Sequence, residues 1–389
     1  MKREWSVMMP RPLEGLLVLD FSQFLSGPYA GLRLADLGAR VIKIERTDGG
    51  DLCRRLYISN LELDGDSTLF HSINRNKESY AVDLKSEAGK IKVRKLLQHA
   101  DIMIQNFRPG VIEKLGFGYE EVKQINPRLI YGSISGYGKE TPLRSRPGQD
   151  LLLQALTGLP WLHGGNHRRR PIPFGLAIAD MISGAHLVQG ILAALVRRSA
   201  QGKGALVEVN MLESTLDVMQ EVWDELWMPA AHAHASSGRI QFRRTVKGLY
   251  PTATEYIALK DMPLEVLAAA LDVELASSMS GDEAVIFMQE RLLTQPADYW
   301  VDIFIKHGIA CEKLLNWEQL RSQDVFHKLQ MTQNIKRDPD IDMIALACPI
   351  RFNGYRLQYA KGAPRIGEHN TWIESEACSL NTADHHRNI

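Results

Sequence analysis

Short apolar runs alternate with segments of helical spacing along the first half of the chain. Residues 16–21 are almost wholly apolar, as expected of a parallel strand that is covered on both faces. Residues 29–37 follow with the spacing of an amphipathic helix that stops at Gly38, and residues 40–45 form a second predicted strand. A strand, a helix and a strand within about 30 residues predict a right-handed βαβ unit.

The same alternation continues to about residue 228. Ser86 has the side chain of a helix N-cap and precedes one of the helical segments. The rhythm predicts an α/β fold built on a doubly wound, mainly parallel sheet. Further strands are predicted at residues 79–84, 102–106, 129–134 and 205–209, and helices at residues 86–100, 180–199 and 211–228.

The chain changes character after residue 225, and its 389 residues favour two folding units. The α/β segment forms the first unit, a smaller α+β unit follows it, and the end of the chain is interpreted as a return segment. The predicted segments are residues 1–225 for the large domain, 226–245 for a linker, 246–331 for the small domain, 332–348 for a second, polar linker and 349–389 for the return to the large domain.

Charge and composition narrow the range of partners. The 46 Lys and Arg residues balance the 46 Asp and Glu residues, so no basic surface for nucleic acid is predicted. No uninterrupted apolar stretch reaches the roughly 18 residues that a membrane span needs, and the first residues do not resemble a signal peptide. Four cysteines without CxxC spacing predict no zinc site and no disulfide framework. We therefore expect a cytoplasmic protein without nucleic-acid or membrane partners.

Common nucleotide and hydrolase motifs do not occur in this sequence. The turn after the first predicted strand, residues 22–28, lacks the GxGxxG pattern of dinucleotide-binding proteins. The patterns GxxxxGK[ST], HExxH and GxSxG are also missing. These absences argue against ATP, zinc-peptidase and serine-hydrolase chemistry.

A series of short motifs runs in a fixed order from about Pro12 to Trp372. It includes Gly27-Pro28, Val41-Ile42-Lys43-Ile44-Glu45, Asn106-Phe107-Arg108-Pro109-Gly110 and Gly148-Gln149-Asp150-Leu151-Leu152-Leu153-Gln154-Ala155. In this order the motifs resemble the family III CoA-transferases, which include formyl-CoA:oxalate and carnitine CoA-transferases. The resemblance implies a large Rossmann-like domain made of both chain ends, with a smaller domain inserted between them. It implies a homodimer whose two chains pass through each other like interlocked rings. It also implies that no cofactor is bound permanently and that coenzyme A thioesters are substrates.

The resemblance gives Asp150 a catalytic role, because the Asp of this motif is the nucleophile in the family. Asp150 would attack an acyl-CoA thioester to form a mixed anhydride, and the CoA thiolate would then form an aspartyl-CoA thioester. Taken alone, an Asp before a helix is usually an N-cap, so this role depends on the motif. The predicted reaction moves CoA from an acyl-CoA to a small carboxylic acid.

Two other functions stay open. Family members that racemise 2-methylacyl-CoA carry a His immediately before this Asp, whereas Gln149 cannot take up a proton at neutral pH and so favours transfer. Asp180 corresponds to a second racemase residue, but transferases have an Asp there as well. The remaining alternative is a non-catalytic CoA-binding paralogue, against which the intact Asp150 argues.

The resemblance also implies a set of CoA contacts, and it implies no metal ligand. Ser26 would place its amide close to the thioester, and Arg46 would contact phosphate or adenine. Gln23 would either hold substrate or cap backbone groups. The full set of predicted contacts is Leu25, Ser26, Arg46, Val82, Asp83, Leu84, Lys85, Asn106, Phe107, Arg108 and Lys114.

The acceptor acid is not identified by the sequence. Oxalate-specific relatives have a glycine-rich loop in the small domain, but residues 239–250 contain only Gly248, which argues against oxalate. Arg239, Arg243 or Arg244 would be able to hold a carboxylate through two hydrogen bonds.

Overall fold

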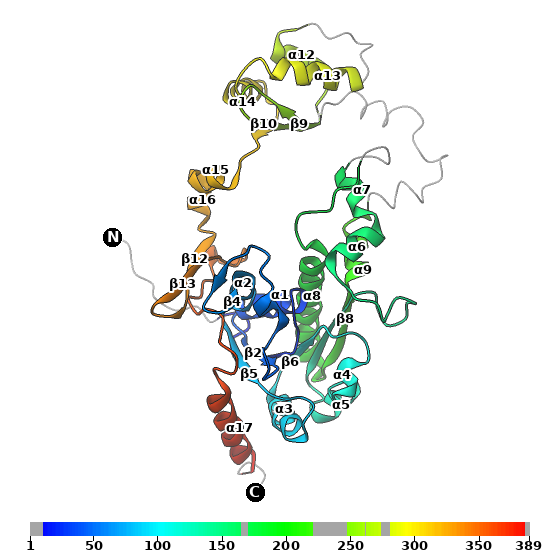
Figure 1. Cartoon of the computed structure of the whole chain (residues 1–389), viewed down its shortest axis with the longest axis vertical. Helices are drawn as coiled ribbons and strands as arrows, with labels where there is room; N and C mark the ends of the chain where they lie inside the picture. Colours follow the sequence, from blue (N-terminus) through cyan, green and yellow to red (C-terminus); the bar gives the residue numbers. More distant parts are fainter. Residues whose placement is uncertain (1–10, 165–169, 221–246, 261, 274–280, 386–389) are drawn as a thin grey trace. The chain divides into compact units, whose positions relative to one another are not determined.

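The protein is described by a computed structural model that covers residues 11–164, 170–220, 247–260, 262–273 and 281–385 (Figure 1). The chain forms two compact units. The larger consists of Met1–Gln220 with Gln330–Ile389, and the smaller is Glu221–Leu329.

A six-stranded parallel sheet forms the centre of the larger unit. Its strand order is β5-β2-β1-β6-β7-β8, so the chain builds the sheet outward from β1 in two directions. This order confirms the predicted α/β fold with a parallel sheet, and it places a crevice at the carboxyl ends of β1 and β6. The strands are β1 (Leu17–Asp20), β2 (Arg40–Glu45), β5 (Lys77–Ala81), β6 (Ile102–Gln105), β7 (Ile130–Ser135) and β8 (Ala205–Asn210).

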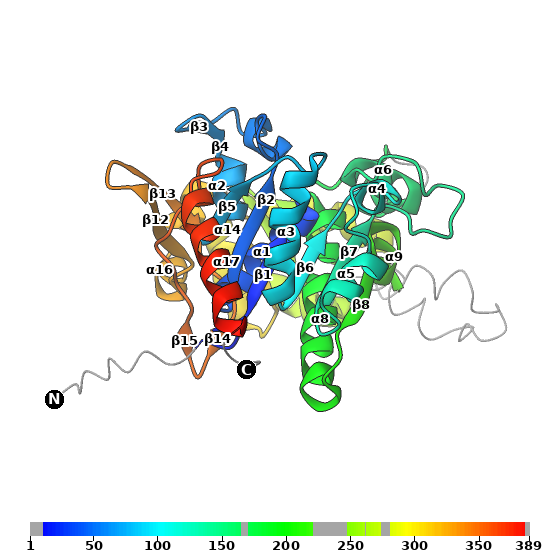
Figure 2. The same cartoon turned by 90° about the horizontal axis from the view of Figure 1, so that it is seen from below.

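Helices cover both faces of this sheet. Val18 and Ile104 pack with α1 and α8 on one face, whereas Leu19 and Met103 pack with α3, α5 and α17 on the other. Figure 2 shows α3, α5 and α17 together on the same side of the strands. Because neighbouring strand residues face opposite layers, both must be apolar, which explains the apolar runs in the sequence. The helices are α1 (Ser26–Asp36), α3 (Glu87–His99), α5 (Tyr119–Ile125), α8 (Ile178–Gln201) and α17 (Asn370–His385).

The helix α8 is the one described helix that is long and apolar enough to cross a membrane, judged by length and composition alone. Its residues Leu187 and Ile191 are fully buried against the sheet, and it also packs along α1. Shorter elements complete the larger unit. They are η1 (Leu52–Arg55), β3 (Glu62–Leu63), β4 (Asp66–Ser67), α2 (Thr68–Asn74), α4 (Val111–Lys114), α6 (Asp150–Thr157), α7 (Leu159–Gly164), α9 (Met211–Asp217), β14 (Arg351–Phe352) and β15 (Tyr355–Arg356).

Residues 332–348 were predicted to be a polar linker, but the structure differs from this prediction. They form an antiparallel hairpin of β12 (Thr332–Asp338) and β13 (Ile341–Leu346). Gln333 and Ile335 are buried on one side of β12 and alternate with exposed neighbours. This period of two is the signature of a strand with one solvated face, and the polar composition concealed it.

Two other elements differ clearly from their predicted bounds, and the predicted N-cap at Ser86 is confirmed. The third strand spans Lys77–Ala81 instead of residues 79–84, because the charged side chains at its start are buried in ion pairs. The helix predicted at residues 211–228 ends at Asp217, and residues 221–246 lie outside the described part of the chain. Ser86 caps α3 by accepting a hydrogen bond from the Gly89 amide.

The smaller unit has an antiparallel sheet of order β11-β10-β9 covered by helices. Ile257, Trp300 and Phe304 are buried in its own apolar core. Its elements are β9 (Gly248–Pro251), β10 (Tyr256–Leu259), α12 (Leu264–Leu271), α13 (Gly281–Leu292), α14 (Ala297–Lys306), β11 (Cys311–Lys313), α15 (Trp317–Ser322) and α16 (Asp324–Leu329).

Candidate active site

A cavity of about 390 Å³ opens where β1, β2, β5 and β6 end. Apolar side chains such as Ile44, Val82 and Phe107 form part of its wall, while the cations Arg46 and Lys85 are exposed at its rim. Such a cavity suits a ligand with a flat apolar group and attached anions. Six of the predicted CoA contacts line it: Arg46, Val82, Asp83, Leu84, Lys85 and Phe107.

The other predicted contacts do not line this cavity. Leu25 packs against the small core cluster that contains Cys53 and Phe70. Arg108 and Lys114 are exposed. Ser26 and Asn106 form hydrogen bonds beside the cavity, and Gln23 lies on its wall.

The floor of the cavity carries buried ions that the sequence analysis did not assign to the site. Lys43 is fully buried and contacts the Asp51 carboxylate at 2.7 Å and the Ser22 carbonyl at 2.8 Å. Burial opposes the charge of Lys43, but Asp51, Asp20 and Glu45 outweigh it and raise the pKa of Lys43. Lys43 is thus bonded to groups of the protein itself, whereas the side chains of Arg46 and Lys85 are exposed to solvent. The feature of the sequence that could have indicated these buried ions is the presence of Lys43 and Glu45 among the apolar residues of a predicted strand.

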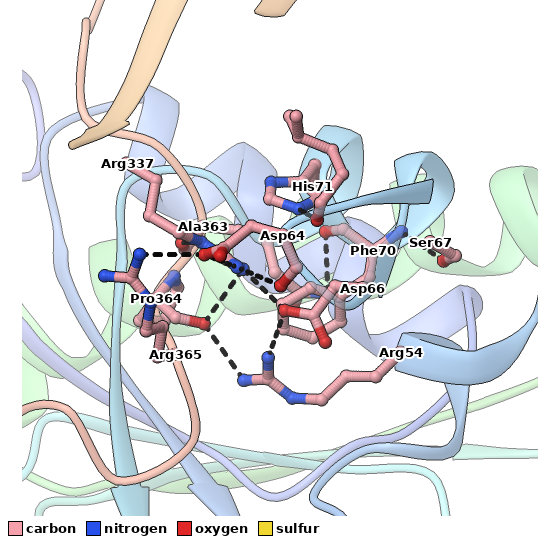
Figure 3. A network of polar contacts seen from close by, with 12 residues as sticks. Arg54, Asp64, Asp66, Ser67, Phe70, His71, Arg337, Ala363, Pro364 and Arg365 are labelled. Carbon is pink, nitrogen blue, oxygen red and sulfur yellow. Dashed lines mark hydrogen bonds and ion pairs between the residues drawn. The ribbon is translucent and has the colours of Figure 1, made fainter. Parts of the chain in front are cut away.

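A network of ion pairs supports the cavity wall from behind (Figure 3). Arg54 donates to both Glu45 oxygens at 2.7 and 2.8 Å and to Asp66 at 2.8 Å. Arg337, on β12, donates to the same Asp66 oxygen at 2.6 Å. Glu45 also accepts a hydrogen bond from the Asp51 amide at 2.9 Å, so the network fixes the loop between β2 and η1.

Asp150 is the first residue of α6 and is partly buried. Its Oδ1 accepts a hydrogen bond from the Ala179 amide at 2.7 Å, and its Oδ2 accepts one from Gln154 Nε2 at 2.5 Å. Gln154 is itself buried and accepts a hydrogen bond from the Phe174 amide. Gln149 stands before Asp150 as an exposed N-cap residue without a side-chain capping bond. The carboxylate is therefore oriented by its neighbours while its loop remains accessible.

Two glycines fix the loop that carries Asp150 against the end of β7. A Cβ built on Gly136 would lie 2.6 Å from the Gly148 Cα, and one built on Gly148 would lie 2.4 Å from the Gly136 Cα. Only glycine permits two backbones to approach this closely. The pair therefore places Asp150 above the carboxyl edge of the sheet.

A second carboxyl group, Asp180, lies beside Asp150 in the first turn of α8. The Ser26 amide and hydroxyl both donate hydrogen bonds to it. Burial and then the charge of Asp150 raise the pKa of Asp180 to about 7, although the Ser26 bonds act in the opposite direction. Asp180 is consequently protonated for a large part of the time at neutral pH.

Asn106 joins the cavity to this pair of carboxyl groups. Its side chain donates to the Gln23 carbonyl at 2.7 Å and to Ser26 Oγ at 3.2 Å, and it accepts from the Gln23 amide at 2.8 Å. A continuous line of contacts thus runs from the cavity wall through Asn106 and Ser26 to Asp180. It crosses between β1 and β6, where the strand order reverses and ligands bind in such sheets.

The first turns of three helices meet this line of contacts. Ser26 begins α1, Asp150 begins α6 and Asp180 lies in the first turn of α8. None of the three is capped by the side chain of its own N-cap residue, and the first-turn amides of Ser26 and Ala179 bond instead to the carboxyl groups of Asp180 and Asp150. This arrangement can stabilise charge that develops during attack by a carboxylate.

Within the described ranges no group of His, Cys, Asp and Glu side chains could hold a metal ion. Cys53, Cys311 and Cys348 are free thiols. Arg239, Arg243 and Arg244, suggested as acceptor ligands, lie outside the described residues.

Comparison with known proteins identifies the family. A model of CoA-transferase family III matches residues 13–370. An acetyl-CoA:oxalate CoA-transferase from Acetobacter aceti is 31% identical over 94% of this chain and 95% of its own, and a human succinyl-CoA:glutarate CoA-transferase is 27% identical over 94% and 86%. The solved structure of a CAIB/BAIF family protein from Brucella suis has a TM-score of 0.80, with 27% identity over 95% of this chain and 100% of that chain.

Proposed function

Because the chain belongs to CoA-transferase family III, we propose that Asp150 is the nucleophile through which it moves coenzyme A between carboxylic acids. The chain is an enzyme of the CoA-transferase class. The observation that carries the assignment is the position of Asp150, held by Ala179 and Gln154 at the uncapped start of α6. Its carboxylate is oriented and lies among backbone amides that can stabilise an anion.

The reaction would proceed by acyl transfer to and from this carboxylate. An Asp150 oxygen attacks the thioester carbonyl, the carbon–sulfur bond breaks, and an aspartyl mixed anhydride and a CoA thiolate result. The thiolate then attacks the aspartyl carbonyl and releases the donor acid, leaving an aspartyl-CoA thioester. The acceptor carboxylate attacks the aspartyl carbonyl of this thioester and expels the CoA thiolate, which gives a second mixed anhydride. The thiolate then attacks the acceptor carbonyl of that anhydride, so that the new acyl-CoA forms and the Asp150 carboxylate leaves. Each step exchanges one carboxyl derivative for another, so no external oxidant, reductant or permanently bound cofactor is required.

Coenzyme A would bind in the cavity at the carboxyl edge of the sheet. Val82, Leu84 and Phe107 offer an apolar surface for the adenine ring, and Arg46 and Lys85 offer cations for the phosphates. The contacts through Asn106 and Ser26 lead from there toward Asp150, in the direction that the pantetheine arm would follow. In this proposal Leu25 supports the loop from the core, and Arg108 and Lys114 lie outside the cavity lining.

The substrates would be an acyl-CoA and a small carboxylic acid. The relatives named for oxalate and for glutarate support this class without identifying the acid. We further propose the interlocked homodimer and a cytoplasmic location, with which the free thiols of the described chain are compatible.

Mass spectrometry of the intact protein tests this function. We expect a covalent adduct after mixing with a suitable donor from a panel that includes acetyl-CoA and succinyl-CoA, and we expect hydroxylamine to remove it. The Asp150→Ala variant should form no adduct. Absence of any adduct, together with exchange of the substrate α-proton in deuterated water, would instead support the racemase alternative.

Replacing Phe107 with alanine tests the cavity as the CoA site. Removing this ring from the wall should raise the KM for acyl-CoA by roughly tenfold, because contact with an aromatic ring contributes about 0.5–1.5 kcal/mol beyond the buried area. The value of kcat should change little, since the adenine lies far along the substrate from the thioester. Phe326→Ala, in α16 of the smaller unit and not among the residues that line the cavity, is the matched control. An unchanged KM for Phe107→Ala in steady-state assays would place CoA elsewhere.

A further inference from the structure

Phe24 has an unusual backbone conformation in the segment that joins β1 to α1. Its φ is +64°, which lies in the left-handed region that side chains rarely adopt. Among the described non-glycine residues with positive φ, the others are Asn, Asp or Gln, and Phe24 is the one aromatic residue. Its side chain is 47% exposed, so burial of the ring does not explain the conformation. Other contacts must hold the backbone in this state.

Hydrogen bonds hold the backbone of the two residues before Phe24 and the Phe24 amide itself. Asn106 bonds to both the amide and the carbonyl of Gln23, at 2.8 and 2.7 Å. The Asp51 carboxylate accepts a hydrogen bond from the Phe24 amide at 3.1 Å. Asp51 is almost fully buried and is itself held by Lys43 and by the Cys53 amide. Lys43 also holds the Ser22 carbonyl, so the segment is fixed at three successive residues.

The strained segment ends where the reacting groups begin. Two residues after Phe24, Ser26 starts α1 and donates hydrogen bonds from its amide and hydroxyl to Asp180, the neighbour of Asp150. The direction of the first turn of α1 therefore depends on the backbone angles of Phe24. A relaxed Phe24 would turn the amide of Ser26 away from the two carboxyl groups.

We propose that Asp51 is a positioning residue for the transfer reaction, which holds Phe24 in its left-handed conformation and so aims the first turn of α1 at the thioester. The proposal rests on the function proposed above and extends it to a residue on the cavity floor. Asp51 belongs to the same loop that Glu45 and Arg54 fix from behind. The strain at Phe24 is thus maintained by the wall of the cavity that would bind CoA.

A substitution at Phe24 should reveal this dependence. Glycine adopts a positive φ without strain, whereas alanine does not. In the native background Asp51→Ala should lower kcat by roughly 10–100-fold, because a small misplacement near reacting atoms can cost about 100-fold. In a Phe24→Gly background the same substitution should lower kcat by less than about fivefold, while a Phe24→Ala background should give no such relief.

The comparison between backgrounds separates positioning from other effects of Asp51. Asp51→Ala removes the partner of Lys43 in all three backgrounds. This effect on kcat therefore cancels when the losses of kcat in the three backgrounds are compared. An equal loss of kcat in the Phe24→Gly and native backgrounds, or a rise in KM without a change in kcat, would overturn the proposal.

Urea unfolding of the same variants tests the holding contact without any substrate. The stability lost on Asp51→Ala should be smaller in the Phe24→Gly background than in the native background, and equal losses would also contradict the proposal. If the native protein transfers CoA from no donor, the proposed function fails, whereas the unfolding comparison still decides whether Asp51 restrains Phe24.

Discussion

Asp150→Ala is expected to lower kcat for CoA transfer by at least about 10⁴-fold, because removal of a covalent nucleophile has effects of this size in other enzymes. Asp180 cannot replace it, since its carboxyl group is bonded to Ser26 and is protonated for a large part of the time near neutral pH. Chromatography of the acyl-CoA products provides the measurement. The KM for acyl-CoA should remain within a few-fold, because the cavity that would hold the nucleotide does not include Asp150.

Gln149→Ala is the matched control for this substitution. Gln149 is adjacent in sequence, exposed and without a capping bond, so its loss should leave the helix start intact. We expect activity within about threefold of the native value, as for surface substitutions in general. If Asp150→Ala retained a tenth of the native kcat, another group would have to be the nucleophile.

The second large effect concerns pH and Asp180. Since the pKa of Asp180 is raised to about 7, turnover should fall as the pH rises from 6 to 8, because its ionisation places a second negative charge beside Asp150. That charge would repel both the released thiolate and the acceptor carboxylate. Asp180→Asn is neutral at every pH and should remove most of this fall. The measurement is kcat as a function of pH for both proteins, and an identical alkaline fall in the variant would assign the titration to another group.

The raised pKa of Asp180 also predicts the direction in which the stability of the protein changes with pH. A carboxyl group whose folded-state pKa is raised from 3.8 to about 7 binds more protons in the folded than in the unfolded protein between these values. Its contribution therefore becomes less favourable as the pH rises through this window. Thermal unfolding should accordingly show Asp180→Asn to be more stable than the native protein at pH 8 and similar to it at pH 4.

The apolar strands of the sheet were predictable because each must bury both of its faces. The runs that became β1 and β6 are apolar except for one polar residue at the end, and apolar residues also occupy both faces of β2 and β7 at Val41, Ile42, Ile130 and Tyr131. The strand β5 began two residues earlier than predicted because Lys77 and Glu78 resemble a loop. Their partners, Asp20 and Arg40, are 57 and 38 residues away, and no local pattern reveals such pairs.

The candidate site was predictable to a similar extent. The resemblance to family III indicated Asp150, and it also indicated the residues that follow β5, Val82 to Lys85, which line the cavity as one group. The bonds from Asn106 to Gln23 join residues 83 positions apart and leave no trace in spacing. The raised pKa of Asp180 depends on burial and on a neighbouring charge, and both arise only when α6 and α8 meet.

The ion pairs that join Arg54, Asp66 and Arg337 also determine when, during synthesis of the chain, the cavity that would bind coenzyme A can be completed. Asp66 and its partner Arg337 are separated by 271 residues. At about 5–20 residues per second, a ribosome needs roughly 15–50 s to deliver the second after the first. Throughout that interval Asp66 has Arg54 as a partner but lacks Arg337, and Asp64 lacks Arg337 as well. A chain that stops before residue 337 never completes this support, so a truncated product is not expected to sequester coenzyme A.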